Sequence, residues 1–194
     1  MEIIEDDAKK IIMFLRNYIE LNSVASNLNK EIFLNNKINK KVKMRLKVIY
    51  KPTNILIWEA TTEGINLVDY EIMKVAESLV TNNNLKIIFT KQMLNDVGFE
   101  LDIISKQEML GRNFISKLKN IDLENDGLLI KYGVRNGLII FDNETKKTTK
   151  TKLFEEICTK IGLPKYYWKQ PNIKLYKVKV LKFIEVIPGT VIRK

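Results

Sequence analysis

Histidine is absent from the chain, and cysteine occurs once, at Cys158. The lack of histidine excludes histidine-based acid–base catalysis, serine triads and zinc fingers, and a single cysteine excludes an internal disulfide framework. Cys158 lies on the apolar side of a helix expected at 153–161, where a thiol packs as a small hydrophobic side chain. An enzyme built on this chain would have to use carboxylates, lysines, tyrosines, hydroxyl groups or a metal ion bound by oxygen.

Long apolar runs are also missing. The longest one near the start, Ile11–Leu15, is far below the roughly 18 residues that a membrane helix needs. The acidic segment Met1–Asp7 lacks the basic-then-apolar order of a secretory signal. Because 45% of the residues are hydrophobic and 29% are charged, the composition is that of a globular protein. We therefore expect a cytoplasmic protein without a membrane partner.

Basic residues outnumber acidic ones by 33 to 23, and the formal net charge is +10. The excess is concentrated in two blocks, Lys37–Lys51 and Lys146–Lys182, of which the first holds seven basic residues and no acid. Such blocks attract polyanions, and nucleic acid is the commonest polyanion in the cytoplasm. The sequence therefore predicts binding to DNA or RNA. The alternative is that the lysines serve only solubility and thermal stability.

Periodic patterns predict helices and a hairpin in the first third of the chain. Residues 7–20 place apolar side chains at helical spacing, and a second helical segment is expected at 23–33. Residues 44–51 alternate apolar and basic side chains, and the turn 52–54 leads back into 55–60. This pattern predicts a hairpin whose outer face is basic.

Helices and strands alternate from residue 64 onward. The expected elements are a helix at 68–80, a strand at 85–90, a short helix at 92–97, a strand at 99–105, a helix at 107–120, a hairpin at 126–144, a helix at 153–161 and a strand at 173–187. This order favours an α+β (mixed α/β) fold, with N-terminal helices and a basic hairpin before a mixed sheet flanked by helices. Gly64 marks the expected boundary between a helical and hairpin module, residues 1–62, and an α/β domain, residues 63–194.

The hairpin at 126–144 carries the residues most suited to chemistry. If Gly133–Gly137 forms its loop and Tyr132 pairs with Leu138, Asp126 lies opposite Glu144, with Cβ atoms about 5 Å apart. Lys146 then lies on the same face of the strand as Glu144. Two carboxylates beside an ammonium group can hold a divalent cation. The alternative is that these charged side chains only solvate the open end of the hairpin.

On these residues, the segment 105–187 resembles the core of PD-(D/E)xK nucleases, a superfamily of metal-dependent phosphodiesterases. Asp126 matches the acid that opens one strand of that core, and Glu144-Thr145-Lys146 matches its acid-any-lysine triplet, while Glu108 could be the acid of the first helix. The resemblance implies a catalytic set of Asp126, Glu144 and Lys146. It further implies that Asp126 and Glu144 bind Mg or Mn, and that Lys146 positions the attacking water.

The order of elements in residues 7–60 is similar to that of winged helix-turn-helix domains. The resemblance implies that Lys30–Lys43 supplies a helix for the major groove of DNA and that Lys51–Asn54 forms a wing touching phosphate. The alternative is a helical lid packed on a hairpin.

The segment Pro164–Pro171 interleaves aromatic rings with lysines. Rings can stack on unpaired bases while lysines hold the backbone, or they can cover one end of the core. The candidate nucleic-acid contacts therefore form two surfaces. The first consists of Lys40, Lys41, Lys43, Arg45, Lys47 and Lys51. The second consists of Lys147, Lys150, Lys165, Tyr167, Trp168, Lys169, Lys177 and Lys179.

Three functions agree with these patterns. The first is a nucleic-acid-binding protein with two basic surfaces, on a nuclease-like fold that binds without cutting. The second is a magnesium- or manganese-dependent nuclease. The third is an inhibitor or assembly subunit without catalysis, whose basic surfaces meet an acidic protein partner.

Overall fold

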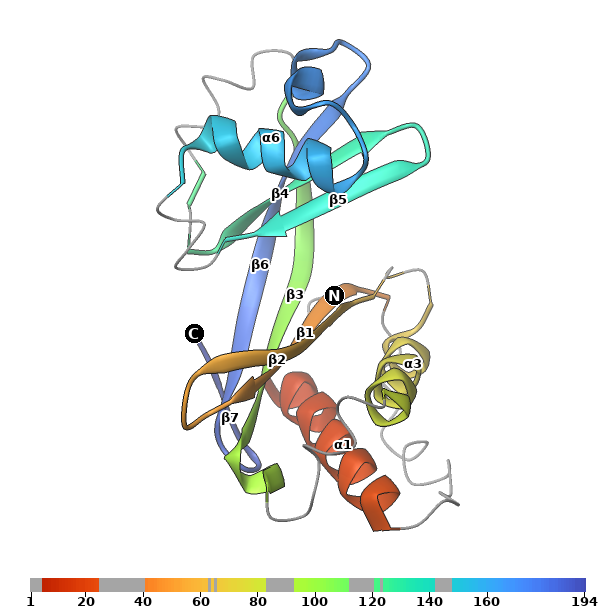
Figure 1. Cartoon of the computed structure of the whole chain (residues 1–194), viewed down its shortest axis with the longest axis vertical. Coiled ribbons are helices and arrows are strands. Elements are labelled where there is room, and N and C mark those ends of the chain that lie inside the picture. Colours follow the sequence, from red (N-terminus) through yellow and green to blue (C-terminus); the bar gives the residue numbers. More distant parts are fainter. Residues whose placement is uncertain are drawn as a thin grey trace. The chain divides into compact units, whose positions relative to one another are not determined.

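The computed structural model describes residues 5–24, 41–62, 64, 66–82, 93–111, 121–122, 124–141 and 148–194. Its elements are α1 (Glu5–Val24), β1 (Lys43–Tyr50), β2 (Ile55–Thr61), α3 (Val68–Thr81), η1 (Met93–Asp96), β3 (Val97–Met109), β4 (Asp126–Tyr132), β5 (Arg135–Ile140), α6 (Lys150–Lys160), η4 (Lys165–Lys169), β6 (Lys174–Ile187) and β7 (Thr190–Arg193). Figure 1 shows them coloured along the chain. They confirm the predicted α+β fold class.

The strands are hydrogen-bonded in the order β2-β1-β3-β6-β4-β5, and β7 pairs with β6. The pairs β1–β2, β4–β5, β4–β6 and β6–β7 are antiparallel. Contacts divide the chain into two compact units: unit 1 comprises residues 1–103 and 181–194, and unit 2 comprises residues 104–180. The module boundary expected near Gly64 is not tested by this grouping and stays a prediction.

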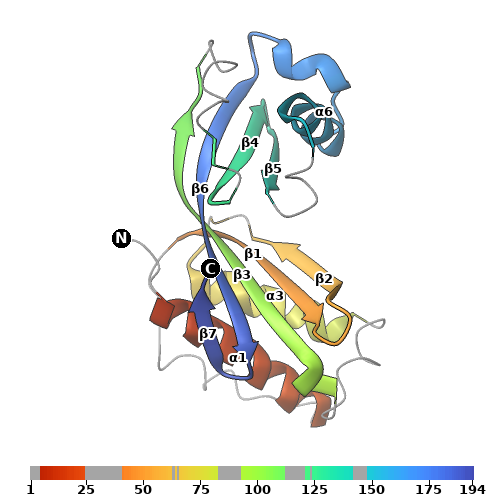
Figure 2. The ribbon, with the colours of Figure 1, turned by 90° about the vertical axis from the view of Figure 1, so that its left-hand side faces the viewer.

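The core of unit 1 lies between two helices and one face of its strands (Figure 2). Helix α1 buries Ala8, Ile11, Ile12, Leu15 and Ile19, which recur at helical spacing as the sequence predicts. Helix α3, predicted at 68–80, contributes its own apolar stripe to the same core. Burial of both stripes, more than intrinsic helix propensity, stabilises these helices.

Strand β1 confirms the alternation predicted for the first hairpin. Met44, Leu46 and Val48 are buried in the unit 1 core, while the residues between them are half-buried on the opposite face. Since side chains of a strand point to alternate faces, one face of β1 packs and the other carries its cations. These cations, Lys43, Arg45 and Lys47, belong to the first of the two predicted basic surfaces.

Unit 2 has a core on each face of its strands. We call the larger one the α6 core, because Leu153, Phe154, Ile157 and Cys158 of that helix pack there against β4 and β5. Burial raises the pKa of the Cys158 thiol, which packs in this core. Gly137 lets the helix approach closely, since a Cβ at that position would lie 2.5 Å from a side-chain carbon of Ile161.

The structure corrects one predicted element and leaves others undescribed. A helix expected at 107–120 does not begin at residue 107, because β3 continues as far as Met109. Residues 112–120 lie outside the described residues, as do the strand expected at 85–90 and most of the second helix expected at 23–33. Within the described ranges, no helix is both long and apolar enough to cross a membrane.

A buried ion pair joins α1 to β6 inside unit 1. Arg16 Nε donates to Glu185 Oε1 at 2.9 Å, and a second guanidinium nitrogen bonds the other carboxylate oxygen. Arg16 also donates to the carbonyls of Leu94 and Val97 at 2.7 and 2.8 Å, and Gly189 N–H donates to Glu185 at 2.9 Å. Because the two side chains are only 10% and 0% exposed, these bonds offset the cost of removing both charges from water.

Glu185→Gln should lower the free energy of unfolding by about 3 to 5 kcal/mol, because it leaves the Arg16 charge buried without its counter-ion. Urea unfolding followed by circular dichroism measures the change. The matched control is Asp6→Asn, which removes the exposed partner of Lys10 and should leave the midpoint almost unchanged. An equally small effect of both substitutions would contradict the assigned role of the buried pair.

Candidate functional site

The hairpin that begins at Asp126 has a different register from the one expected. Strands β4 and β5 place Tyr132 opposite Arg135 and not opposite Leu138. The turn is the dipeptide Gly133–Val134, and the positive φ of 58° at its first position is typical of a type II′ turn. The predicted longer loop is therefore wrong. The expected pairing of Asp126 with Glu144 required that loop, whereas in the observed register Gly127 already lies opposite Ile140.

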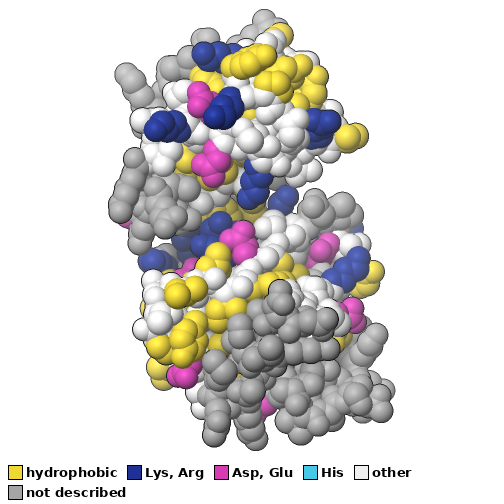
Figure 3. Space-filling model, viewed as in Figure 1, with side chains coloured by type: hydrophobic (Ala, Val, Ile, Leu, Met, Phe, Trp, Pro, Cys, Tyr) yellow, Lys and Arg dark blue, Asp and Glu magenta, His cyan; other side chains and the backbone are white. Residues whose placement is uncertain are grey.

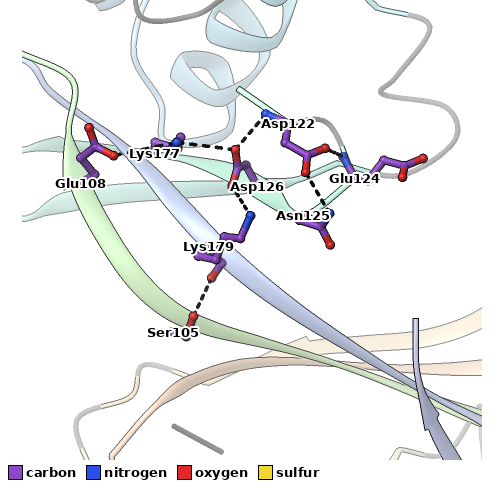
Figure 4. Close-up of polar contacts among 8 residues, drawn as sticks. All are labelled: Ser105, Glu108, Asp122, Glu124, Asn125, Asp126, Lys177 and Lys179. Carbon is purple, nitrogen blue, oxygen red and sulfur yellow. Dashed lines mark hydrogen bonds and ion pairs between the residues drawn. The ribbon is translucent and has the colours of Figure 1, made fainter. Parts of the chain in front are cut away.

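Asp126 lies instead opposite Lys179 of β6 and is only 1% exposed. Figure 4 shows its carboxylate between two lysines. Lys179 Nζ lies 3.4 Å from Oδ1 and Lys177 Nζ lies 3.9 Å from Oδ2, which also accepts the backbone N–H of Asp122 at 2.8 Å. Lys177 lies 3.8 Å from Glu108 as well. The two ammonium groups offset the charge of the buried carboxylate.

The loop before β4 is closed by its own hydrogen bonds. Asp122 accepts the Asn125 side-chain amide at 2.8 Å and the Glu124 backbone N–H at 2.9 Å. Both bonds lower the pKa of Asp122 because they favour its charged form, and the bond from the Asn125 side chain has the larger effect. Val180 N–H donates to the Asn125 carbonyl at 2.8 Å, which attaches the loop to β6.

The described part of this cluster forms an ionic link between β4 and β6. Glu144 and Lys146, the other predicted catalytic residues, lie outside the described residues. Of the two predicted metal ligands, Asp126 and Glu144, the structure therefore describes only Asp126. Within the ranges that the structure describes, no group of three or more histidine, cysteine or acidic side chains could hold a metal ion. Lys177 and Lys179 keep 28% and 47% of their side-chain surface exposed, so both can still contact an anion from solvent.

The first basic surface is compensated by acidic neighbours. Arg45 donates to Asp102 at 2.8 and 2.6 Å and lies 3.8 Å from Glu59. Lys47 lies 4.0 Å from Glu100. The side chains of Arg45 and Lys47 are only 12% and 13% exposed. The face of the hairpin that was expected to be basic is therefore close to neutral around these two cations.

The remaining members of the first surface differ in their surroundings. Lys51 donates to the Val186 carbonyl at 3.3 Å, and burial lowers its pKa. Lys41 is exposed and Lys43 is half-buried. Lys40 lies outside the described residues.

The aromatic residues predicted for the second surface mainly cover the α6 core. Trp168 is 6% exposed and stacks on Phe154, with ring centroids 5.3 Å apart. Tyr167 packs edge-on against Tyr132 at 5.5 Å, and a hydrogen bond with Tyr132 raises the pKa of Tyr167. These two rings therefore cover one end of the core, which is the second of the two interpretations given for this segment.

The charged members of the second surface are more accessible. Lys165 and Lys169 are exposed on η4. Lys147 and the side chain of Lys150 lie outside the described residues.

Tyr166 and Arg135 are among the exposed residues of unit 2 that the sequence-based candidates did not include. Tyr166 is 63% exposed, whereas both of the aromatic residues that follow it pack inward. Arg135 is exposed and donates to the Gly162 carbonyl at 2.9 Å, beside the loop that leads to η4. The run Tyr166-Tyr167-Trp168 contained a signal for Tyr166, because consecutive residues of a helical turn cannot all face one core.

Comparisons with known proteins relate the chain to one family. The AMMECR1 family model matches residues 68–183. Protein MJ0810 of Methanocaldococcus jannaschii is 29% identical over 108 residues, which are 54% of each chain. Protein TV1384 of Thermoplasma volcanium is 29% identical over 97 residues, which are 50% of this chain and 48% of that protein. The matches thus span about half the length of these curated relatives.

A solved structure shares the fold of the whole chain. The crystal structure of the uncharacterized protein PH0010 from Pyrococcus horikoshii superposes with a TM-score of 0.76 and covers 100% of this chain and 99% of its own. At 18% identity this likeness shows the fold alone.

These findings overturn both resemblances expected from the sequence. The family match spans residues 68–183 and includes most of the segment 105–187 that was compared with PD-(D/E)xK nucleases. No nuclease or winged-helix family is among the matches. The nuclease-like motif was misleading because it is short and depended on a hairpin register that the protein does not adopt.

Asp126→Asn should lower the free energy of unfolding by about 1 to 3 kcal/mol, because Lys177 and Lys179 then face a neutral group in a largely buried position. Chemical unfolding measures this loss. Glu108→Gln is the control, since Glu108 is 63% exposed and its pair with Lys177 should contribute little. Equal effects of the two variants would contradict the assigned role of Asp126.

The contribution of Asp122 should depend on pH. Its pKa is lower in the folded protein than its ordinary value of 3.8. Its stabilising effect is therefore complete above that value and is lost as pH falls through the lower folded pKa. The stability difference between wild type and Asp122→Asn should be larger at about pH 6 than at about pH 3. Unfolding curves at both pH values check this, and a difference that grows at acid pH would contradict it.

Proposed function

The chain belongs to the AMMECR1 family, and we propose that this member binds nucleic acid through unit 2. The observation that carries the proposal is the division of charge between the units. Residues 104–180 hold sixteen lysines and arginines against eight acids, a net charge of +8 out of the +10 of the chain. Unit 1 has more residues and a net charge of only +2.

The second half of unit 2 concentrates this excess. From Ile157 to Val180 the sequence has six lysines and no acidic residue. Lys160, Lys165, Lys169 and Lys174 of this stretch are all exposed. Figure 3 shows lysine and arginine side chains spread over the visible face of unit 2 next to hydrophobic ones. A field of one sign on this scale attracts a polyanion and orients it before contact.

The paired cations of unit 1 support the choice of unit 2. Arg16, Arg45 and Lys47 contact carboxylates within unit 1 and are largely buried. A cation that already has a buried acidic partner releases fewer counter-ions from a nucleic acid, and so contributes less to binding. We therefore assign the proposed contacts to the second predicted surface and not to both.

The strand order places further cations beside the same region. Lys131 of β4 lies opposite Lys174 of β6, and its ammonium group lies 5.0 Å from the ring centroid of Tyr176. Two neighbouring lysines repel each other unless an anion lies nearby, and a bound phosphate would relieve this repulsion. The proposed location is the cytoplasm, where nucleic acid is abundant.

Replacing Lys165, Lys169 and Lys174 together with glutamine should weaken binding of a labelled oligonucleotide at least about tenfold at low salt. It should also reduce the slope of log affinity against log salt by about 2 to 3, because each phosphate contact contributes just under one unit. Fluorescence anisotropy between about 50 and 200 mM salt measures both quantities.

The matched control replaces Lys9, Lys74 and Lys194, three exposed lysines of unit 1, with glutamine. It changes the net charge by the same amount and should leave affinity almost unchanged. Equal losses in the two triple variants would show that only total charge matters. Absence of oligonucleotide binding at low salt would refute the proposal and leave an acidic protein partner as the function to test.

A further inference from the structure

Tyr166 is the most exposed aromatic side chain of unit 2 for which the structure gives a value, with 63% of its surface accessible. Its neighbours along the chain are anchored. Trp168 is stacked on Phe154 inside the α6 core, and Tyr167 packs against Tyr132. The ring of Tyr166 is thus exposed on a short helix, and the other two aromatic residues of that helix anchor the helix to the core.

The backbone that carries Tyr166 is also restrained. Tyr167 N–H donates to the Pro164 carbonyl at 2.9 Å, and Gln170 N–H donates to the Tyr167 carbonyl at 2.9 Å. Pro164 and Pro171 flank η4 and limit the conformations of the segment. Little backbone entropy remains to be lost when a ligand contacts the ring, which favours binding at this position.

Two lysines of η4, Lys165 and Lys169, lie close to Tyr166 along the chain. In a 3₁₀-helix the side chains at i and i+3 start from the same face, so Lys169 begins on the face of Tyr166. Its ammonium group lies 5.1 Å from the ring centroid of Trp168. Lys165 precedes Tyr166 and is also exposed. The rings of Tyr166 and Tyr167 have centroids 6.5 Å apart and are tilted by 50°, so a second ring lies near the first. An exposed ring on a short helix that also carries two exposed lysines matches one nucleotide, whose base can stack while its phosphates meet the lysines.

We propose that Tyr166 stacks on an unpaired base, so that the nucleic acid bound by unit 2 is single-stranded. This inference rests on the proposed function, since it requires nucleic acid at unit 2. A duplex keeps its bases stacked on each other and offers a ring such as Tyr166 no exposed face except at its ends. A single strand offers a base face at every nucleotide, and stacking of this kind depends little on sequence.

The test compares two labelled probes of equal length and charge: an oligothymidylate and an abasic strand that has the same sugar-phosphate backbone without bases. Wild type should bind the thymidylate strand on the order of five- to a hundredfold more tightly than the abasic strand. Tyr166→Ala should remove most of this preference without changing affinity for the abasic strand. Tyr166→Phe should keep it, because the ring and not the hydroxyl group stacks.

Tyr70→Ala supplies the matched control. Tyr70 of unit 1 is 53% exposed and has the Lys74 ammonium 4.6 Å from its ring centroid, so it is a similar ring beside a lysine. This variant should keep the wild-type preference for the thymidylate strand. Loss of the preference in Tyr70→Ala as well would overturn the assignment to Tyr166.

The outcomes separate this inference from the function on which it rests. Equal binding of thymidylate and abasic strands by wild type would refute base stacking and leave electrostatic binding by unit 2 intact. A wild-type preference that survives in Tyr166→Ala would refute the role of Tyr166 alone. Failure to bind either strand at low salt would refute both proposals.

Discussion

Strand β6 is the constraint on which most of the structure depends, because it contributes to every hydrophobic cluster of the described residues. Leu175 belongs to the α6 core, Val178 and Val180 to the core on the other face of unit 2, and Leu181 and Phe183 to the unit 1 core. Where such a strand is buried, a charged side chain is tolerated only if a partner meets it. The charged residues of β6 therefore determine where ionic links must form in each unit.

Two such ionic links form, and they differ in how much of their charged groups remains exposed to a ligand. Glu185 is fully enclosed with Arg16, and every contact described for that pair stabilises unit 1. Lys177 and Lys179 meet Asp126 but remain partly exposed. The Arg16–Glu185 pair leaves no charge for binding a ligand, because both groups are buried and already paired within the protein. The second leaves two ammonium groups at the surface of the unit that carries most of the net charge.

Local patterns predicted much of the fold because they depend on near neighbours. The alternation at Met44–Tyr50, the apolar stripes of α1 and α3, and the helix that contains Cys158 are each decided by the period of burial, which is visible in the sequence. The register of the hairpin after Asp126 was not predicted. Several glycines offered alternative turns, and a shift of three residues changed the residue facing each side chain without changing the pattern of apolar residues.

The sequence by itself determined the element types, the α+β class and the excess of positive charge, because these follow from composition and local periodicity. Only the tertiary structure decided which charges are available. Arg45 and Lys47 belong to an acid-free stretch of sequence, yet carboxylates from other strands neutralise them. The sequence left open whether Trp168 stacks on bases or covers the core; in the structure it packs on Phe154, whereas Tyr166 remains exposed. Partners that lie far apart along the chain meet only on folding, so sequence proximity could not reveal them.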